Sequence, residues 1–258
     1  MTSDLFDVSG KVALITGGSR GIGFMIAKAY AAAGMRVYIS SRKPEACNAA
    51  AEEIAAFGEC ISLPADCSQM SEIERVADHL KANESKLHVL VNNAGATWGG
   101  GIDEFPEKGW DKVMDLNLKS PFFLLQKVLP LMEAAGDAVD PARVINVGSV
   151  DGMHTPIFEN FSYAPSKAGL HHLTRILSAH LAPRHITANV IAPGPFLTSM
   201  MEPMIASMGE ETILENVPLK RMGGQDDAGG VAIFLAARAS AYITGVVLPV
   251  DGGIMGGV

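Results

Sequence analysis

A tyrosine and a lysine four residues apart are the pair in this sequence with the clearest chemical potential. Tyr163 and Lys167 would lie on one face of a helix, one turn apart. A free phenol titrates near ~10, and a neighbouring ammonium group lowers that pKa by favouring the phenolate. The pair could then exchange a proton with a carbonyl or alcohol oxygen. Because such pairs are also common on helix surfaces, the assignment depends on the residues around them.

Two further polar residues occur where such chemistry could use them. Ser149 ends an apolar segment, 144–149, that we expect to be a buried strand, so its hydroxyl would point beyond the carboxyl end of the sheet. Asn117 falls within a predicted helix, where asparagine is unfavourable. That cost suggests a role for Asn117, although an ordinary surface asparagine is the alternative.

A glycine-rich turn precedes the first predicted helix. Gly17 would permit the tight turn, Gly21 a close approach of the backbone to a pyrophosphate, and Gly23 close packing of helix on strand. The helix N-terminus would offer free N–H groups to phosphate. The spacing G-x-x-x-G-x-G differs from the commoner G-x-G-x-x-G. The predicted cofactor-binding residues in this turn are Gly17, Ser19, Arg20, Gly21, Ile22 and Gly23.

The end of the second predicted strand indicates which dinucleotide the turn would hold. NAD enzymes usually place an acid there to bind the ribose 2′-hydroxyl. This sequence has Ser41 followed by Arg42, which would instead accept a 2′-phosphate through charge-assisted hydrogen bonds. Arg20 could stack on the adenine. These residues favour NADP(H) as the cofactor. The alternative is that Arg20 and Arg42 are ordinary surface residues.

Charge and hydropathy exclude several classes of protein. The net charge is −8, with 28 acidic and 20 basic residues and no cluster of lysine and arginine, so we expect no nucleic-acid partner. No uninterrupted apolar run reaches ~18 residues, which argues against a membrane span. The acidic N-terminus lacks the basic region of a secretory signal, so a cytoplasmic protein is expected.

Metal and disulfide chemistry are also not expected. The three cysteines are an odd number without CxxC spacing, which disfavours a disulfide framework and a cysteine zinc site. His171 and His172 lack metal-ligand spacing to other histidines or acids, and we expect both at the surface or in an interface.

Short β-branched segments alternate with helical patterns along the whole chain. Because the strand segments lack a polar face, they should be buried on both sides, which predicts an α/β protein with a doubly wound parallel sheet and helices on both faces. No linker divides the chain, so residues 1–258 are read as one domain. The predicted strands are 11–16, 36–40, 61–63, 87–92, 143–147, 187–191 and 246–250, and the predicted helices include 21–33, 44–57 and 71–82.

Taken together, these motifs resemble those of the short-chain dehydrogenase/reductase family over nearly the whole chain. The order and spacing of the motifs carry the resemblance, and it implies a Rossmann-like fold. Within the family, segments 92–99 and 163–168 are most similar to 3-oxoacyl-(acyl-carrier-protein) reductases and the ketoacyl reductase of rhamnolipid synthesis. The motifs are Thr16 to Gly23, Asn92-Asn93-Ala94-Gly95, Asn117, Ser149, Tyr163 with Lys167, Pro193-Gly194 and Asp251-Gly252-Gly253.

The resemblance implies a role for each catalytic position. Tyr163 would be the general acid that protonates the carbonyl oxygen as hydride arrives. Lys167 would bind the nicotinamide ribose and lower the pKa of Tyr163. Ser149 would polarise the carbonyl, and Asn117 would hold a helix kink and a water leading to Lys167.

It also implies further cofactor contacts. Pro193, Gly194 and Thr198 would flank the nicotinamide. Asp66 would meet the adenine amino group, with Cys67 contributing backbone. The residues that would line the adenosine ribose are Asn92, Asn93, Ala94 and Gly95.

Two segments should shape the substrate site. Residues 195–215 would form a lid, and their methionines suit an adaptable apolar pocket, although ordinary helix packing explains them equally well. One residue more than expected separates Ser149 from Tyr163, and we place it in the loop 153–161, bordering the substrate. The methionines are Met200, Met201, Met204 and Met208.

Two macromolecular partners are considered. An acyl carrier protein is acidic and would need a basic patch, for which Lys127, Arg175 and Arg184 are the candidates unless they are scattered surface charges. The family usually forms homotetramers through the helices bearing Asn117 and Tyr163. The apolar residues available on these helices are Phe122, Phe123, Leu124, Leu125, Leu170, Leu173, Ile176 and Leu177.

Three functions remain open at this point. The first is NADPH-dependent reduction of 3-oxoacyl thioesters. The second is the same chemistry on another carbonyl or alcohol, such as a sugar, polyol, steroid or xenobiotic. The third is a sensing module that binds NADP(H) without turnover, which the presence of Tyr163, Lys167 and Ser149 disfavours.

Overall fold

The computed structural model describes residues 3–156 and 158–256, which form a seven-stranded parallel sheet flanked by helices. The strand order is β3-β2-β1-β4-β5-β6-β7. The strands β2 and β3 are therefore added on one side of β1, and the strands from β4 onward on its other side. The strands are β1 (Val12–Thr16), β2 (Arg36–Ser40), β3 (Cys60–Ser62), β4 (Val89–Asn92), β5 (Ala142–Val147), β6 (Ile186–Pro193) and β7 (Val247–Val250).

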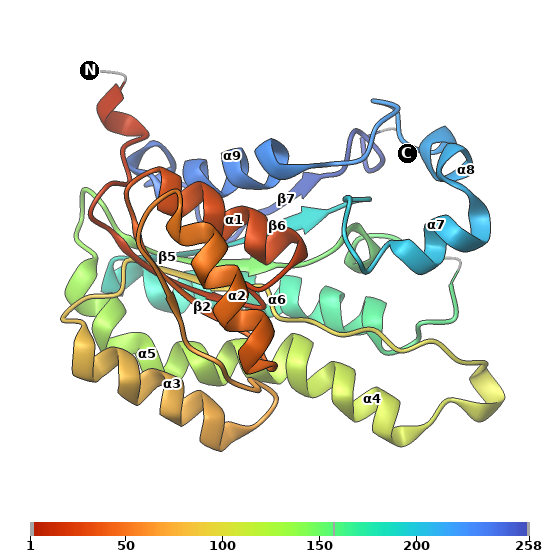
Figure 1. The fold of residues 1–258 in the computed structure, drawn as a ribbon, viewed down its shortest axis with the longest axis horizontal. Coiled ribbons are helices and arrows are strands. Elements are labelled where there is room, and N and C mark those ends of the chain that lie inside the picture. The colour runs from red at the N-terminus through yellow and green to blue at the C-terminus, as the bar shows by residue number, and fades with distance from the viewer. Residues whose placement is uncertain (1–2, 157, 257–258) are drawn as a thin grey trace.

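Helices cover both faces of this sheet (Figure 1). One apolar cluster packs three helices against one face, and these are α1 (Gly21–Ala32), α2 (Pro44–Ala55) and α9 (Gln225–Ala236). A second cluster packs three helices against the opposite face, and these are α3 (Met70–Asn83), α5 (Ser120–Ala135) and α6 (Tyr163–Leu181). The predicted α/β class and doubly wound parallel sheet are therefore confirmed.

Burial of the strands follows their place in the sheet. Every residue of β1, β4, β5 and β6 is buried, as expected for strands covered on both faces. The edge strands β3 and β7 are only half-buried, which the expectation of uniformly buried strands did not include. An edge strand has a neighbouring strand on one side alone, so its residues can be apolar and still be partly exposed to solvent.

Helix α9 has no counterpart among the predicted helices. Two adjacent glycines in its interior, Gly229 and Gly230, weaken the helical signal. Gly229 packs directly on α1, where an added Cβ would lie 2.7 Å from the Cβ of Ala29. The residue that lowers helix propensity is therefore the one that allows the two helices to approach.

The parallel arrangement places the residues that follow each strand at one edge of the sheet. Gly17 follows β1, Ser41 follows β2, Asn93 follows β4 and Gly194 follows β6. Doubly wound sheets bind ligands at this edge. Helices α7 (Glu202–Met208) and α8 (Glu210–Glu215) also lie at one end of the molecule, on the right in Figure 1, within the proposed lid segment.

Several predictions extend over residues outside the described part. The predicted single domain, 1–258, includes residues 1–2, 157 and 257–258, which lie outside the described part. The predicted substrate loop, 153–161, includes one of them, residue 157. None of the helices in residues 3–156 and 158–256 combines the length and apolar character that crossing a bilayer requires.

Candidate active site

The turn between β1 and α1 is held in a form that only glycine fits. Gly17 has a φ of +68°, and a Cβ there would lie 2.7 Å from Asn93 Nδ2. A Cβ at Gly23 would collide with Asn93 Nδ2 and the carbonyl oxygen of Gly17. The turn therefore presents bare backbone, and the first N–H groups of α1 have no intrahelical partners. This is the geometry that the sequence predicted for a pyrophosphate site.

Thr16 and Asn93 fasten this turn to the end of β4. Thr16 Oγ1 accepts hydrogen bonds from the backbone N–H groups of Asn93 and Ala94, each at 3.0 Å. Asn93 Nδ2 donates to the carbonyl oxygens of Thr16 (2.9 Å) and Gly17 (3.1 Å). The side chain of Asn93, predicted as a cofactor contact, thus binds the turn itself and fixes its position.

Asn92 is likewise used inside the fold. Its side chain is buried and donates a 2.8 Å hydrogen bond to Asn146 on β5, which in turn donates to Thr174 on α6. Gly95 lies near the catalytic positions, since a Cβ there would lie 3.7 Å from Lys167 Nζ and 3.4 Å from Asn117 Oδ1.

The end of β2 carries an unsatisfied polar group. Among the described residues, Ser41 Oγ is buried without a hydrogen-bond partner. The next residue, Arg42, is exposed. A buried hydroxyl without a partner costs free energy, so this position suits an incoming acceptor group. A phosphate oxygen placed between the hydroxyl of Ser41 and the guanidinium of Arg42 would satisfy both.

Asp66 and Cys67 follow β3 at the same edge of the sheet. The Asp66 carboxylate accepts hydrogen bonds from the backbone N–H (3.1 Å) and the hydroxyl (2.7 Å) of Ser68. Cys67 is buried, with its Sγ 3.9 Å from Ser40 Oγ, and burial raises the pKa of its thiol to about 11. Cys67 is therefore a packing residue with an unreactive thiol, and its backbone alone can serve a ligand.

Asn117 lies in a π-helical turn, η3 (Asp115–Lys119), between α4 (Glu107–Met114) and α5. Its Oδ1 accepts from Ala96 N (2.8 Å), and its Nδ2 donates to Ala96 O (2.9 Å) and Ser166 Oγ (3.0 Å). Asn117 therefore joins the segment after β4 to α6. The wide turn explains why asparagine is tolerated within a helical region, since such turns often mark functional sites.

Ser149, Tyr163 and Lys167 come together at the end of β5. Ser149 follows the strand, and its Oγ accepts a 3.1 Å hydrogen bond from Asp151 N. Lys167 Nζ donates to the carbonyl oxygen of Val147 (2.7 Å) and lies 5.7 Å from the centre of the Tyr163 ring. The helical spacing of Tyr163 and Lys167 thus places a phenol and an ammonium side by side, next to a serine hydroxyl.

Burial dominates the electrostatics of this cluster. Burial raises the pKa of Tyr163 to about 12, against the lowering effect of the Ser149 hydroxyl, and the Asp151 carboxylate adds to the rise. Burial also lowers the pKa of Lys167 to about 8. The expectation that Lys167 would bring the pKa of Tyr163 below its usual value is wrong for this structure. The Tyr163 phenol therefore carries its proton at neutral pH.

His171 is buried, which contradicts the expectation of a surface or interface position; its neighbour His172 is exposed as expected. His171 Nε2 accepts a hydrogen bond of 3.4 Å from Ser149 N. Burial, followed by the charges of Lys167 and Arg175, lowers the pKa of His171 to about 4, so the imidazole is neutral. The sequence signal that could have indicated the position of His171 is its spacing, because it lies one helical turn beyond Lys167 and so on the same face of the helix.

We expect His171→Leu to lower kcat by about 2- to 10-fold with little change in the KM for the cofactor. Ser149 N would lose its acceptor, and a hydrogen bond of this kind contributes roughly 0.5–1.5 kcal/mol. Steady-state kinetics of the carbonyl reduction that the family resemblance implies would measure the effect. The matched control is His172→Leu, which removes the exposed neighbour. Equal losses of kcat in both variants would contradict the positioning role of His171.

The segment after β6 lies against the glycine-rich turn. A Cβ on Gly21 would be 3.3 Å from Cγ2 of Thr198, so Thr198 covers the start of α1. Phe196 is buried, and the backbone on either side of it binds Gly223 (Leu197 N to Gly223 O, 3.1 Å; Gly223 N to Pro195 O, 2.9 Å). The start of the predicted lid is therefore anchored.

Beyond this anchor, the methionines of the predicted lid are not core residues. Met200 and Met208 are exposed, and Met201 and Met204 are half-buried. Simple core packing therefore does not account for them.

Two of the three basic residues considered for a partner surface are already paired. Lys127 Nζ lies 2.7 Å from Glu74 Oε1, and Arg184 forms an ion pair with Glu133. Their charges are compensated, so the proposed basic patch reduces to Arg175, which is exposed on α6.

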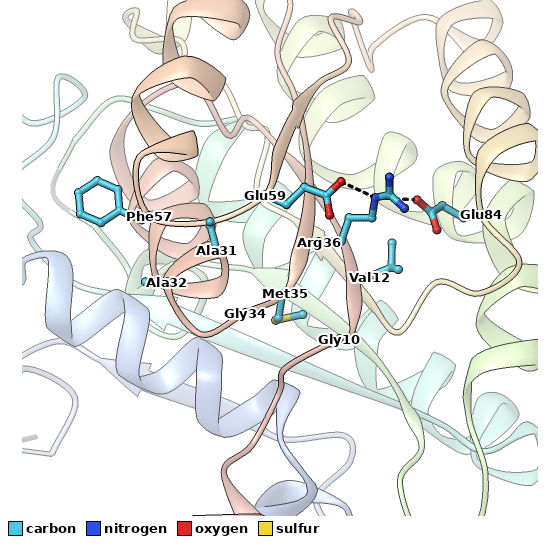
Figure 2. A pocket seen from close by; sticks show the side chains of 11 residues that line it. Gly10, Val12, Ala31, Ala32, Gly34, Met35, Arg36, Phe57, Glu59 and Glu84 are labelled. Atoms are coloured by element: carbon cyan, nitrogen blue, oxygen red, sulfur yellow. Dashed lines mark ion pairs between the residues drawn. The ribbon is translucent and has the colours of Figure 1, made fainter.

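A hollow of about 530 Å³ lies at the opposite edge of the sheet, near the start of β1 and β2 (Figure 2). Its arginine, Arg36, is bound by two carboxylates, with Nε 2.9 Å from Glu59 Oε1 and 3.3 Å from Glu84 Oε1. An anion would find no free positive charge there. The cluster of polar groups at the carboxyl ends is the better candidate site. Residues 3–156 and 158–256 contain no group of three or more metal-ligating side chains arranged around one point.

Comparison with known proteins shows which proteins this chain resembles. A family model described as enoyl-(acyl carrier protein) reductase matches residues 17–255. A rhamnolipid-biosynthesis 3-oxoacyl-(acyl-carrier-protein) reductase from Pseudomonas aeruginosa is 44% identical over 250 residues, covering 96% of this chain and 97% of that protein. A 7alpha-hydroxysteroid dehydrogenase from Escherichia coli is 34% identical over 254 residues, covering 97% and 96%.

The fold is also shared with a solved structure. The Pseudomonas aeruginosa RhlG/NADP active-site complex superimposes with a TM-score of 0.94 at 43% sequence identity, covering 97% of this chain and 98% of that chain.

Proposed function

The chain belongs to the short-chain dehydrogenase/reductase family, and we propose that it is an NADPH-dependent reductase that converts 3-oxoacyl thioesters into 3-hydroxyacyl thioesters. The observation that carries the chemistry is the cluster of Ser149, Tyr163 and Lys167 beside a glycine-lined turn. The 3-oxoacyl substrate is supported by the 44% identity to the Pseudomonas aeruginosa relative.

Four residues would carry the reaction. Tyr163, protonated at neutral pH because burial raises its pKa, would donate its phenolic proton to the substrate carbonyl oxygen. The Ser149 hydroxyl would donate a hydrogen bond to the same oxygen. Lys167 would hold the cofactor ribose, and Asn117 would keep α6 in place relative to the segment after β4.

The residues around the glycine-rich turn fit NADP(H). Bound NADPH would supply the hydride that the carbonyl carbon accepts. The bare backbone at Gly17, Gly21 and Gly23 would admit the pyrophosphate. The unpartnered Ser41 hydroxyl, with Arg42 and Arg20, would bind the 2′-phosphate. Pro193, Gly194 and Thr198 would flank the nicotinamide, and Asp66, Cys67, Ala94 and Gly95 the adenosine half.

The same proposal includes a lid at 195–215, a homotetramer and an acyl carrier protein as the donor of substrate. The exposed methionines support the lid. Half-exposed apolar residues on the helices of Asn117 and Tyr163, among them Ile176, support self-association. The acyl carrier protein has weaker support, because the charges of Lys127 and Arg184 are already compensated by ion pairs and are not free to bind an acidic partner.

A different carbonyl substrate is the second candidate. The 34% identity to a 7alpha-hydroxysteroid dehydrogenase over nearly the whole chain favours this alternative, because the name of that relative gives a steroid alcohol as its substrate. A non-catalytic sensing module is the least favoured, since Ser149, Tyr163 and Lys167 are all in place.

The first experiment is NADPH oxidation with acetoacetyl-coenzyme A and with a longer 3-oxoacyl thioester. We expect saturable turnover of both, since the catalytic cluster is complete. No turnover of either thioester, together with intact NADPH binding by fluorescence, would contradict the thioester substrate. A screen of ketosteroids, sugars and polyols would then test the second candidate.

A further inference from the structure

An aromatic hollow of about 420 Å³ lies beside the catalytic segments and has no role in the chemistry described above. Its walls come from two segments that are distant in sequence: residues 102–110, which include the first turn of α4, and the loop leading into α6. Four of its lining residues are apolar and one is acidic: Ile102, Phe105, Glu107, Trp110 and Phe161.

Both walls are continuous in sequence with segments that contact the catalytic cluster. Phe161 lies two residues before Tyr163. The other wall continues from Ala96, whose backbone N–H and carbonyl groups are both bound by Asn117. The two segments are joined by a 3.0 Å hydrogen bond from Gly100 N to Glu159 O. The hollow is therefore held in a fixed position relative to the site where the carbonyl would react.

The aromatic rings keep the hollow open at the surface. Phe105 and Phe161 meet edge to face, with ring centres 5.9 Å apart. Ile102 remains 73% exposed, Trp110 42% and Phe161 37%. Apolar side chains gathered in one exposed place generally mark a site that an apolar partner covers. Further along the sequence, Leu197 and Met200 of the proposed lid segment are exposed as well.

We propose that this hollow binds the apolar end of the 3-oxoacyl chain and gives the enzyme a preference for longer acyl groups, an inference that rests on the proposed function. The volume is within the usual ~300–1,000 Å³ range of ligand sites. Glu107, on its rim, disfavours an anionic occupant, so the phosphate-bearing carrier arm would lie elsewhere. Each methylene moved from water into the hollow should raise kcat/KM by about fourfold.

The test compares kcat/KM for acetoacetyl-coenzyme A and 3-oxodecanoyl-coenzyme A. The wild type should prefer the longer thioester. Ile102→Asn, at an exposed position, and Phe161→Ala should each lower the long-to-short ratio by about tenfold or more. The matched control is Val139→Asn, an exposed apolar residue on the turn between α5 and β5, which should leave the ratio unchanged.

A binding measurement separates this inference from the proposed function. The chain has two tryptophans, so Trp98→Phe leaves Trp110 as the only fluorescent indole. Decanoyl-coenzyme A should change the Trp110 emission saturably, and Ile102→Asn in this background should weaken that binding by about tenfold. Acetyl-coenzyme A should leave the emission unchanged.

Each outcome decides between the two claims. Turnover of acetoacetyl-coenzyme A with no chain-length preference, or with a preference that both hollow variants retain, overturns the inference and leaves the function standing. Saturable binding at Trp110 without turnover of any thioester supports the acyl site and contradicts the function. If Ile102→Asn lowers the mass measured by light scattering, a second copy of the chain covers the hollow, and the inference is overturned.

Discussion

Replacing Tyr163 with phenylalanine is expected to lower kcat for carbonyl reduction by about 10²–10⁴-fold. The substitution removes the phenolic proton that would be transferred to the carbonyl oxygen and keeps the ring, which lies beside Lys167. Because burial keeps the phenol protonated in the wild type, the loss should be similar at all neutral pH values. Steady-state oxidation of NADPH measures it.

Binding of the cofactor provides the control for that variant. NADPH should bind Tyr163→Phe within about twofold of the wild type, because Lys167 keeps its hydrogen bond to the Val147 carbonyl oxygen. A loss of kcat below tenfold with unchanged binding would remove Tyr163 from the role of general acid. Equal loss of activity and of NADPH binding would indicate a damaged site.

The second large effect is expected at the end of β2. Ser41→Asp combined with Arg42→Ala should lower kcat/KM for NADPH by about 10- to 100-fold and raise it for NADH. A carboxylate at residue 41 would repel the 2′-phosphate and could accept a hydrogen bond from a 2′-hydroxyl. Charge-assisted hydrogen bonds contribute roughly 1.5–3 kcal/mol each, which sets the scale.

The control for this variant is a cationic residue away from the turn. Lys108 is exposed on α4, and Lys108→Ala changes the net charge by one unit without touching β2. Its NADPH to NADH ratio should equal that of the wild type. A double variant that keeps the wild-type ratio would show that Ser41 and Arg42 do not recognise the 2′-phosphate.

Much of the fold and of the catalytic cluster follows from local sequence signals. Apolar segments of strand length alternate with helical patterns, and this alone predicts a parallel sheet covered on both faces. Parallel strands then bring their carboxyl ends to one edge, so Gly17, Ser41 and Ser149 are placed at that edge by connectivity. The spacing of Tyr163 and Lys167 determines that they share a helix face. These inferences need only periodicity and chain direction.

The tertiary structure decided what depends on the packing of distant segments. The burial of His171 against the end of β5 comes from the way α6 packs on the sheet. The raised pKa of Tyr163 comes from desolvation, which exceeds the lowering effect of the Ser149 hydrogen bond. The side chain of Asn93 donates a hydrogen bond to the turn after β1 and does not point outward toward a ligand. This contact depends on β1 and β4 being neighbours in the sheet.

The aromatic hollow is the clearest case of a feature that sequence could not supply. Ile102 and Phe161 are separated by many residues, and neither belongs to a periodic pattern that predicts contact. Both line one hollow because the segments after β4 and β5 leave adjacent strands of the same sheet. Local sequence determines the direction in which each strand ends, whereas burial, pKa and the shape of a pocket depend on which other segments are packed there.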